Sequence, residues 1–185
     1  IKQLQDLTQR IRFSKAPVVA APHHLTLGGG FELIAPAAHR VAAGELYIGA
    51  VEVGVGLIPG AGGNLRLILN LMENSGKGRI NAFQVSQKAF ETIGFAKVAT
   101  SADEAKFLGY LLKSDTVIIN NDHRILAAKQ KALAMVNDGY KPPQYRDDLK
   151  LPGTGGRTAM AMALKGFKAQ GKISSYDELI AKKLA

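Results

Sequence analysis

The pattern of hydrophobic and polar positions along the chain predicts short strands that alternate with helices. Residues 1–14 repeat apolar positions at the spacing of one helix face, from Ile1 to Ile11. Helices are predicted over residues 1–14, 30–38, 62–74, 83–94 and 121–139. Strands are predicted in the short apolar runs 17–22, 39–44, 95–100 and 115–120. This alternation indicates an α/β fold.

The part of the sequence after about residue 138 differs from the part before it, because only helices are predicted there. We therefore divide the chain into a core of residues 1–138 and a C-terminal helical region of residues 139–185, which would serve assembly and help to cover a site. Two S-x-x-E patterns predict capping boxes, at Ser101 with Glu104 and at Ser175 with Glu178. Residues 45–63 are predicted to be mostly loop with short extended pieces, and a turn and a loop are predicted over residues 75–81 and 140–156.

The composition limits the class of protein. Hydrophobic residues make up 46% and charged residues 21% of the 185 positions, which is typical of a globular protein. The absence of cysteine excludes a disulfide framework and a thiolate metal site, and it favours a reducing compartment such as the cytoplasm. No apolar run approaches the ~20 residues of a membrane span, and no stretch is typical of a signal peptide. Because the sequence opens on Ile1, we expect it to be a fragment or a processed piece.

The net charge of +9 and the pI of about 9.8 indicate an acidic partner. Nucleic acid and a phosphorylated small molecule are both candidates, and a merely solvated basic surface is an equally acceptable interpretation. Aromatic residues are only 6% of the chain and do not alternate with basic residues, as they would on a single-strand binding surface. We therefore expect no nucleic-acid partner.

Three consecutive glycines, residues 28–30, lead into the helix predicted over residues 30–38, in the stretch TLGGGFELIA. Glycine lets a substrate oxygen approach the backbone closely, and the first N–H groups of a helix have no partner within it. The N–H of Gly29 could therefore hold an oxyanion, with Glu32 close by in the first helical turn. The pattern is weak evidence alone, because an acidic residue in the first turn also stabilises the helix dipole.

Glu52 strengthens this interpretation. It lies among valines in the glycine-rich stretch GAVEVGVGLIPGAGG, where partial burial would raise its pKa towards a range useful for proton transfer. The following PGAGG segment predicts a second turn rich in N–H groups at Gly60. Two carboxylates beside one oxyanion site is the arrangement expected for adding water next to a carbonyl group, or removing it.

The stretch APHHLTLGGGFEL, followed by VEVGVGLIPGAGG, resembles the enoyl-CoA hydratase/isomerase (crotonase) family. It is most similar to the hydratase part of bifunctional 3-hydroxyacyl-CoA dehydrogenases in fatty-acid β-oxidation. The similarity runs from about Lys15 through Gly63, and the later stretch AFETIGFAKVATSADEAKFLGYL also resembles that subgroup. The resemblance implies a spiral of ββα units, assembly into trimers or larger homo-oligomers, and an acyl-CoA thioester as substrate.

The resemblance also implies roles for particular residues. Gly29 matches the glycine that donates one oxyanion-hole N–H, and Glu32 and Glu52 match the two catalytic glutamates. Gly60 matches the glycine that helps to place the catalytic water. Family isomerases typically keep only one of the two glutamates, so the presence of both favours hydration. No metal or cofactor is implied for this portion, since CoA belongs to the substrate and NAD would bind only in a separate dehydrogenase domain. Further substrate contacts are expected from Leu27, Gly28 and Gly30.

The sequence departs from the family pattern in two places. His23 and His24 stand where the family usually has an asparagine–glycine pair, and in an extended segment their side chains should diverge and make a poor metal site. The first half of the family's core, with its second oxyanion N–H and most of its adenine pocket, is missing. A non-catalytic acyl-CoA-binding or assembly module is therefore the alternative, and a basic nucleic-acid binder is a more distant one. Lysines that could meet CoA phosphates, although a solvated helix face is the commoner role, are Lys165, Lys168, Lys172, Lys182 and Lys183.

Overall fold

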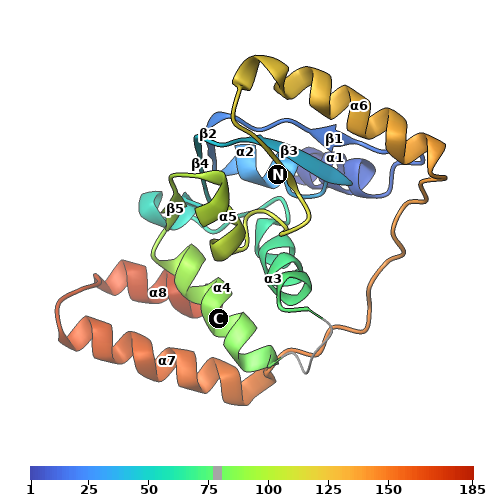
Figure 1. The fold of residues 1–185 in the computed structure, drawn as a ribbon. Coiled ribbons are helices and arrows are strands. Elements are labelled where there is room, and N and C mark those ends of the chain that lie inside the picture. The colour runs from blue at the N-terminus through green and yellow to red at the C-terminus, as the bar shows by residue number, and fades with distance from the viewer. Residues whose placement is uncertain (77–80) are drawn as a thin grey trace.

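The computed structural model describes residues 1–76 and 81–185 and has an α/β architecture (Figure 1). Its helices are α1 (Lys2–Arg12), α2 (Gly29–Ile34), α3 (Gly63–Asn74), α4 (Ala82–Gly94), α5 (Ala102–Leu108), α6 (Arg124–Asn137), α7 (Gly153–Ala169) and α8 (Ser175–Leu184). Its strands are β1 (Val19–Ala20), β2 (His24–Leu27), β3 (His39–Ala43), β4 (Leu46–Gly49), β5 (Val98–Ala99) and β6 (Thr116–Ile118). Two short 3₁₀ helices are η1 (Glu52–Val55) and η2 (Asn121–His123). The α/β class predicted from the sequence is confirmed.

The strands form two small sheets, each of three strands within the described residues. One sheet has the order β1-β3-β6 with all pairs parallel. The other has the order β2-β4-β5, in which β2 and β4 are parallel and β5 is antiparallel to β4. In Figure 1, α6 covers the end of the molecule that holds β1 and β3, and α7 and α8 lie at the opposite end against α4. The carboxyl ends of β2 and β4 are paired, Leu27 with Gly49, and the candidate site begins there.

The core is built from apolar side chains of α2, α3, α4, β4 and the segment after α5. Phe31, Ile48, Leu67 and Tyr110 are fully buried, and the rings of Phe31 and Tyr110 meet edge to face with centroids 5.0 Å apart. Burying such side chains contributes roughly 1.5–3 kcal/mol each. Because Phe31 is adjacent in sequence to Glu32, this packing also fixes the helix turn that carries that carboxylate.

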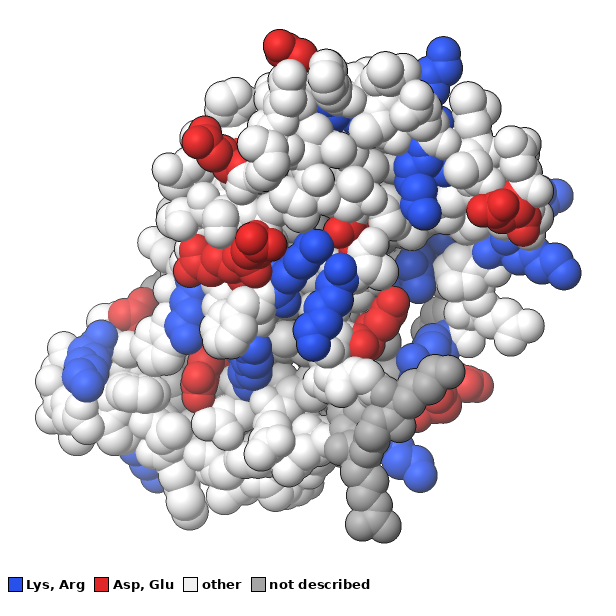
Figure 2. Space-filling model, in the orientation of Figure 1, with Lys and Arg blue, Asp and Glu red and all other residues white. Residues whose placement is uncertain are grey.

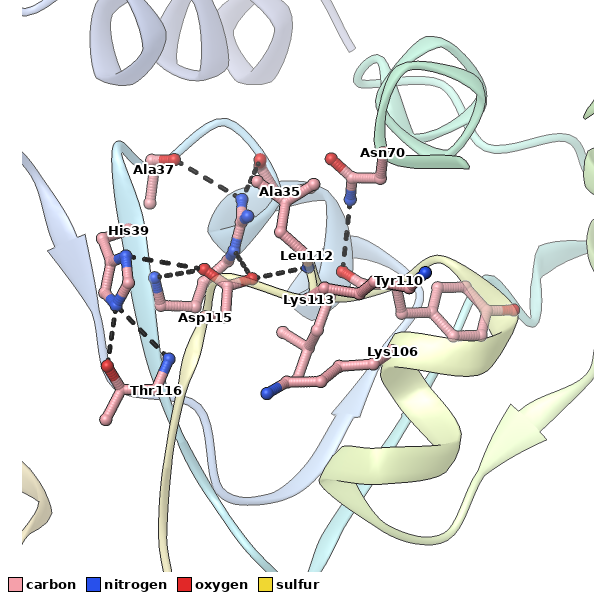
Figure 3. A network of polar contacts seen from close by, with 12 residues as sticks. Ala35, Ala37, His39, Asn70, Lys106, Tyr110, Leu112, Lys113, Asp115 and Thr116 are labelled. Carbon is pink, nitrogen blue, oxygen red and sulfur yellow. Dashed lines mark hydrogen bonds and ion pairs between the residues drawn. The ribbon is translucent and has the colours of Figure 1, made fainter. Parts of the chain in front are cut away.

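A buried ion pair joins β3 to the segment that leads into β6 (Figure 3). Arg40 Nε donates to Asp115 Oδ2 over 2.7 Å, and the Arg40 backbone N–H donates to Oδ1 over 3.0 Å. The Leu112 N–H donates to the same carboxylate over 2.7 Å, and Arg40 Nη1 donates to the Ala35 carbonyl over 3.0 Å. This network orders a connection that has no regular secondary structure of its own.

Several element boundaries differ from those predicted. The helix expected over 30–38 ends at Ile34: Ala35 still has a helical backbone conformation, but Pro36 has no N–H with which to continue the helical hydrogen bonds. The loop expected over 140–156 ends earlier, since α7 begins at Gly153 directly after Pro152, whose φ of −69° suits a helix start. The strand expected over 17–22 is paired only at Val19–Ala20. Within the turn expected over 75–81, positions 77–80 lie outside the described residues.

The two capping boxes also differ from the prediction. At α8 the box is Ser174 with Asp177, one residue earlier than expected, because the sequence SSYDE offers both registers. At α5 the Ser101 hydroxyl accepts from the Glu104 N–H over 3.1 Å as predicted. The Glu104 carboxylate, however, accepts from the backbone N–H of Thr100 over 2.8 Å, so this box is only half formed.

The C-terminal helices pack on the rest of the molecule through α4. Met160 and Leu164 of α7 are buried, and Phe167 meets Phe95 edge to face at 5.4 Å. Between α7 and α8, Glu178 accepts from Lys168 over 2.6 Å, and this bond together with one from Lys182 lowers the pKa of Glu178 to about 2. The division of the chain at about residue 138 stays a prediction. None of the described helices is long and apolar enough to cross a membrane.

Candidate active site

Gly28 connects the end of β2 to the start of α2 and lies directly against Glu52. Its φ of +54° is a conformation that only glycine adopts without strain. A Cβ at this position would lie 3.3 Å from Glu52 Oε1 and 3.8 Å from Val51 Cγ2, so the contact is tight. The Gly28 N–H donates to the Gly49 carbonyl over 2.8 Å, which extends the β2–β4 pairing by one step. Glycine is therefore required at position 28 both for its conformation and for the close approach of a carboxylate.

Glu32 lies in the first turn of α2 and is only 4% exposed. Its Oε1 accepts two backbone hydrogen bonds, from Ala61 N–H over 2.8 Å and from Gly63 N–H over 2.9 Å. A Cβ at position 63 would come within 3.0 Å of both Oε1 and Cγ of Glu32. Two N–H donors on one oxygen fix the carboxylate in a single orientation and leave the other oxygen, Oε2, for a further partner.

Glu52 begins η1 and differs from Glu32 in that its carboxylate has no protein partner. Both oxygens are buried, and neither has a hydrogen-bond donor among the described residues. Burial raises the pKa of Glu52, and the negative charge of Glu32 raises it further, while the nearby N–H of its own backbone partly opposes the shift without forming a hydrogen bond. The expectation that this carboxyl would have a raised pKa is confirmed. An orphaned, buried carboxyl costs stability, and such groups concentrate at functional sites.

Tyr110 supports the segment that leads to Glu52. No motif in the sequence indicated that this residue would be part of the site. Its hydroxyl donates to the Lys97 carbonyl over 2.6 Å and accepts from the Ala50 N–H over 3.2 Å. Ala50 precedes Glu52 by two residues, so the tyrosine holds the short segment between the end of β4 and Glu52 at the start of η1. Burial raises the pKa of Tyr110 to about 12, so the phenol stays protonated and acts as a structural donor.

The glycine-rich turn after Glu52 does something different from what its sequence suggests. The PGAGG segment was expected to present N–H groups to a bound water at Gly60. Within the described residues, the N–H groups of Ala61 and Gly63 instead hold Glu32, and the Gly60 carbonyl accepts from Gln5 Nε2 over 2.7 Å. The turn itself is visible in the sequence, but its contact with Glu32 is not. The role of Gly60 in placing water stays a prediction.

The remaining predicted contacts, Leu27, Gly29 and Gly30, lie at the same edge. Leu27 ends β2, and Gly29 and Gly30 begin α2. A Cβ at Gly29 would meet nothing within 4 Å, and one at Gly30 would meet only Thr26 Cγ2, at 3.9 Å. Gly29 is exposed, and there is free space where its side chain would be. The roles of these three residues in substrate binding are not tested by this geometry.

The prediction that His23 and His24 diverge is wrong. Their rings meet edge to face with centroids 5.0 Å apart, because His24 has a φ of +48° and is not in an extended conformation. They line a cavity of about 460 Å³ together with Glu45 and Asp103, away from the two glutamates. No group of three or more metal-ligating side chains occurs in the part of the chain that the structure describes.

The site is thus one of an α/β protein in which two glycine-rich turns and two glutamates meet near the carboxyl ends of the paired strands β2 and β4, as the resemblance to the crotonase family implies. Comparison with known proteins agrees. Residues 1–133 match the model of the enoyl-CoA hydratase/isomerase family. The chain therefore belongs to the enoyl-CoA hydratase/isomerase family.

The chain is also similar to individual proteins of known or suggested activity. The chain is 44% identical over its whole length to a probable 3-hydroxyacyl-CoA dehydrogenase of Bacillus subtilis, but it spans only 23% of that protein. Over 68 residues, 36% of the chain, it is 44% identical to the fatty acid oxidation complex subunit alpha of Vibrio campbellii, of which it covers 10%. The crystal structure of enoyl-CoA hydratase from Bacillus anthracis aligns with 98% of the chain and 57% of its own length, with a TM-score of 0.57 and 23% identity. The chain is thus similar to proteins of fatty-acid oxidation and much shorter than its curated relatives.

Proposed function

We propose that this chain carries the two catalytic carboxylates of a hydratase that converts 2-enoyl-CoA thioesters to 3-hydroxyacyl-CoA in fatty-acid β-oxidation, as part of a longer protein. The observation that carries the proposal is the carboxylate of Glu52. It is buried without a protein donor, it lies against Gly28, and it is close enough to Glu32 for one charge to shift the other pKa. A pair of carboxylates in which one is fixed and one is free is suited to moving two protons in one reaction.

The two carboxylates differ in their surroundings, and the difference supports separate roles. The N–H groups of Ala61 and Gly63 can only donate, so Glu32 Oε1 must be an acceptor. Glu32 Oε2 would then accept a proton from water as the water oxygen bonds to C3 of the enoyl group. Glu52, whose pKa is raised by burial, would carry a proton and deliver it to C2. A proton transfer from Glu32 back to Glu52 would reset the pair for the next turnover.

The reaction places negative charge on the thioester oxygen while the π electrons of the C2–C3 double bond move towards it. The backbone N–H of Gly29, an exposed residue at the start of α2, is our candidate for one donor to this oxygen. The second donor would come from the part of the longer protein that this chain does not include. We propose no cofactor for this portion, because hydration changes no oxidation state and CoA arrives with the substrate. NAD would act only in a dehydrogenase domain elsewhere in the protein.

The family resemblance also supports two broader proposals. We propose a homo-oligomer built from trimers, and a cytoplasmic location, which the absence of cysteine favours. One observation favours a second candidate function. The chain aligns with only 57% of the B. anthracis hydratase structure, so a non-catalytic acyl-CoA-binding or assembly module is the alternative.

Crotonyl-CoA hydration by the full-length protein that carries this sequence separates the candidates. The loss of absorbance of the conjugated thioester reports the rate. Glu32→Gln and Glu52→Gln should each lower kcat by ~10²-fold or more, the usual scale of acid–base contributions. The exposed Glu45→Gln is the matched control and should retain its rate. Normal hydration by either active-site variant would rule out the proposed pair, whereas acyl-CoA binding without hydration by the wild-type protein would favour the binding module.

A further inference from the structure

A second cavity, of about 480 Å³, lies between α3, α4 and α5. Three lysines line it: Lys88 of α4, Lys106 of α5 and Lys113 of the segment after α5. Polar side chains that can donate hydrogen bonds also line it, among them Asn81 and Gln84. The cavity shares no lining residue with the two glutamates or the glycine-rich turns, and its volume falls in the ~300–1,000 Å³ range of small-molecule sites.

The three lysines are held around this cavity by backbone contacts. Asn74 Nδ2 donates to the Lys106 carbonyl over 3.2 Å, and the Lys113 N–H donates to Asn74 Oδ1 over 2.8 Å. Asn74 therefore fixes the two segments that carry these lysines relative to α3. Lys88 Nζ donates to the Phe107 carbonyl over 2.6 Å and lies 4.1 Å from the centroid of the Phe107 ring. In the view of Figure 3, the labelled side chains of Lys106 and Lys113 lie below Leu112.

The positive charge at this cavity is not balanced by neighbouring carboxylates. Within residues 1–76 and 81–185, no salt bridge involves Lys88, Lys106 or Lys113. Burial lowers the pKa of Lys88, and the charges of Lys97 and Lys113 lower it further, so these cations repel one another. On the face shown in Figure 2, several basic side chains lie near the centre, where α4 and α5 lie in Figure 1, with acidic side chains also in view beside them.

The lysines of the C-terminal helices are a weaker candidate for an anion site. Lys168 and Lys182, which the sequence suggested as phosphate contacts, both bind Glu178 at 2.6 Å and 2.5 Å. Their charge is therefore partly neutralised within the chain. Lys88, Lys106 and Lys113 form no such salt bridge within the described residues, so their cavity is the stronger candidate.

We propose that this cavity binds the phosphate groups of a small phosphorylated ligand. Lysine ammonium groups act as point charges towards phosphate oxygens, and each can form short, charge-assisted hydrogen bonds with them. Three such groups with adjacent amide donors suit a diphosphate better than a single carboxylate, because a diphosphate offers more negative charge and more acceptor oxygens. The phosphates could belong to CoA itself or to a free phosphorylated metabolite, and the test distinguishes these sources.

Calorimetric titration of the full-length protein with inorganic pyrophosphate at constant ionic strength tests the proposal. Lys106→Gln combined with Lys113→Gln should weaken pyrophosphate binding by ~10-fold or more, since two charge-assisted contacts are lost. Lys129→Gln combined with Lys141→Gln removes the same charge from exposed positions elsewhere and should change the affinity less than ~2-fold. Failure of the wild-type protein to bind millimolar pyrophosphate, or equal weakening by both pairs, would overturn the proposal.

Two further arms complete the experiment. If the Lys106→Gln, Lys113→Gln variant unfolds, the Lys106→Arg, Lys113→Arg variant keeps the positive charge and should retain pyrophosphate binding. Loss of binding by this arginine variant in its folded state would contradict a site that binds phosphate through positive charge. Titration with CoA identifies the source. Parallel weakening of CoA and pyrophosphate by the glutamine pair assigns the phosphates to CoA, and unchanged CoA binding assigns the site to a separate metabolite. Glu52→Gln should leave pyrophosphate affinity unchanged, so this test is independent of the proposed hydration.

Discussion

The backbone N–H of Gly63 donates to Glu32 Oε1 over 2.9 Å, and a Cβ at position 63 would lie 3.0 Å from that same oxygen. The first residue of α3 and the first turn of α2 are therefore locked together through one carboxylate. In the proposed reaction this contact sets the direction in which Glu32 can accept a proton.

Gly63→Ala tests this contact directly. The added methyl group must displace either Glu32 or the Phe31 ring, whose Cε1 would lie 3.3 Å from it. We expect kcat for crotonyl-CoA hydration to fall by at least ~10²-fold, because small misplacements of a catalytic group are costly. Gly155→Ala adds the same methyl where nothing lies within 4 Å, and it should leave the rate unchanged. A fully active Gly63→Ala protein would show that the Glu32 position is not critical.

The Glu32→Gln, Glu52→Gln double variant tests whether the two carboxylates work as a unit. Residues that act together in one step are strongly non-additive, so removing the second should cost little once the first is gone. We expect the double variant to lose far less than the product of the two single losses. A loss equal to that product, measured as kcat/KM for crotonyl-CoA, would mean that the glutamates act independently.

Glu52→Gln should raise the thermal stability of the protein near neutral pH while abolishing its activity. Burial raises the folded-state pKa of Glu52, so between the ordinary value of 4.5 and the raised value the folded protein binds more protons than the unfolded one. The stability cost of ionising Glu52 therefore grows as pH rises through this window and is fully present above it. The Tm advantage of Glu52→Gln should be largest at pH 8 and shrink towards pH 4.5. The same advantage at both pH values would contradict the raised pKa.

Tyr176 of α8 packs against Gly56, four residues after Glu52, and this contact ties the C-terminal helices to the proposed site. A Cβ at Gly56 would lie 2.9 Å from Tyr176 Cε1, and Gly56 has a φ of +78°. We expect Gly56→Ala to destabilise the protein by ~1–3 kcal/mol and to lower kcat, because it displaces the Glu52 segment. Tyr176→Phe keeps the ring and loses only a 3.4 Å hydrogen bond to Gly56, so it should stay within ~3-fold of the wild-type rate. Equal kcat values for Gly56→Ala and the wild type would show that the contact between α8 and Gly56 does not affect catalysis.

Asp115→Ala should be among the most destabilising substitutions, since it leaves the Arg40 guanidinium buried without its carboxylate. Breaking a buried pair from one side typically costs ~3–5 kcal/mol. For a chain of this size that corresponds to a Tm decrease of roughly 6–20 °C. Asp115→Leu combined with Arg40→Met removes both charges and should recover part of the loss. A double variant less stable than Asp115→Ala would argue that the network contributes more than charge compensation.

Most of the helices could be predicted from the sequence, because a repeating apolar face is a local signal. Residues 1–14, 62–74 and 83–94 each become a helix within a few residues of the predicted bounds. The strands were predicted too long, since their pairing depends on partners far away in the chain. Val98–Ala99, for example, is limited by its short antiparallel contact with Ile48 and Gly49.

The sequence by itself determined the α/β class, the family resemblance and the identity of the two glutamates, because glycine runs and an acidic residue among valines are visible without a fold. Only the tertiary structure decided what these residues contact. The Ala61 and Gly63 donors, the support from Tyr110, the paired rings of His23 and His24 and the cavity of Lys88, Lys106 and Lys113 all join segments that are distant in sequence or depend on one unusual backbone angle. Such contacts arise from how whole elements pack, and no local pattern of residue types encodes them.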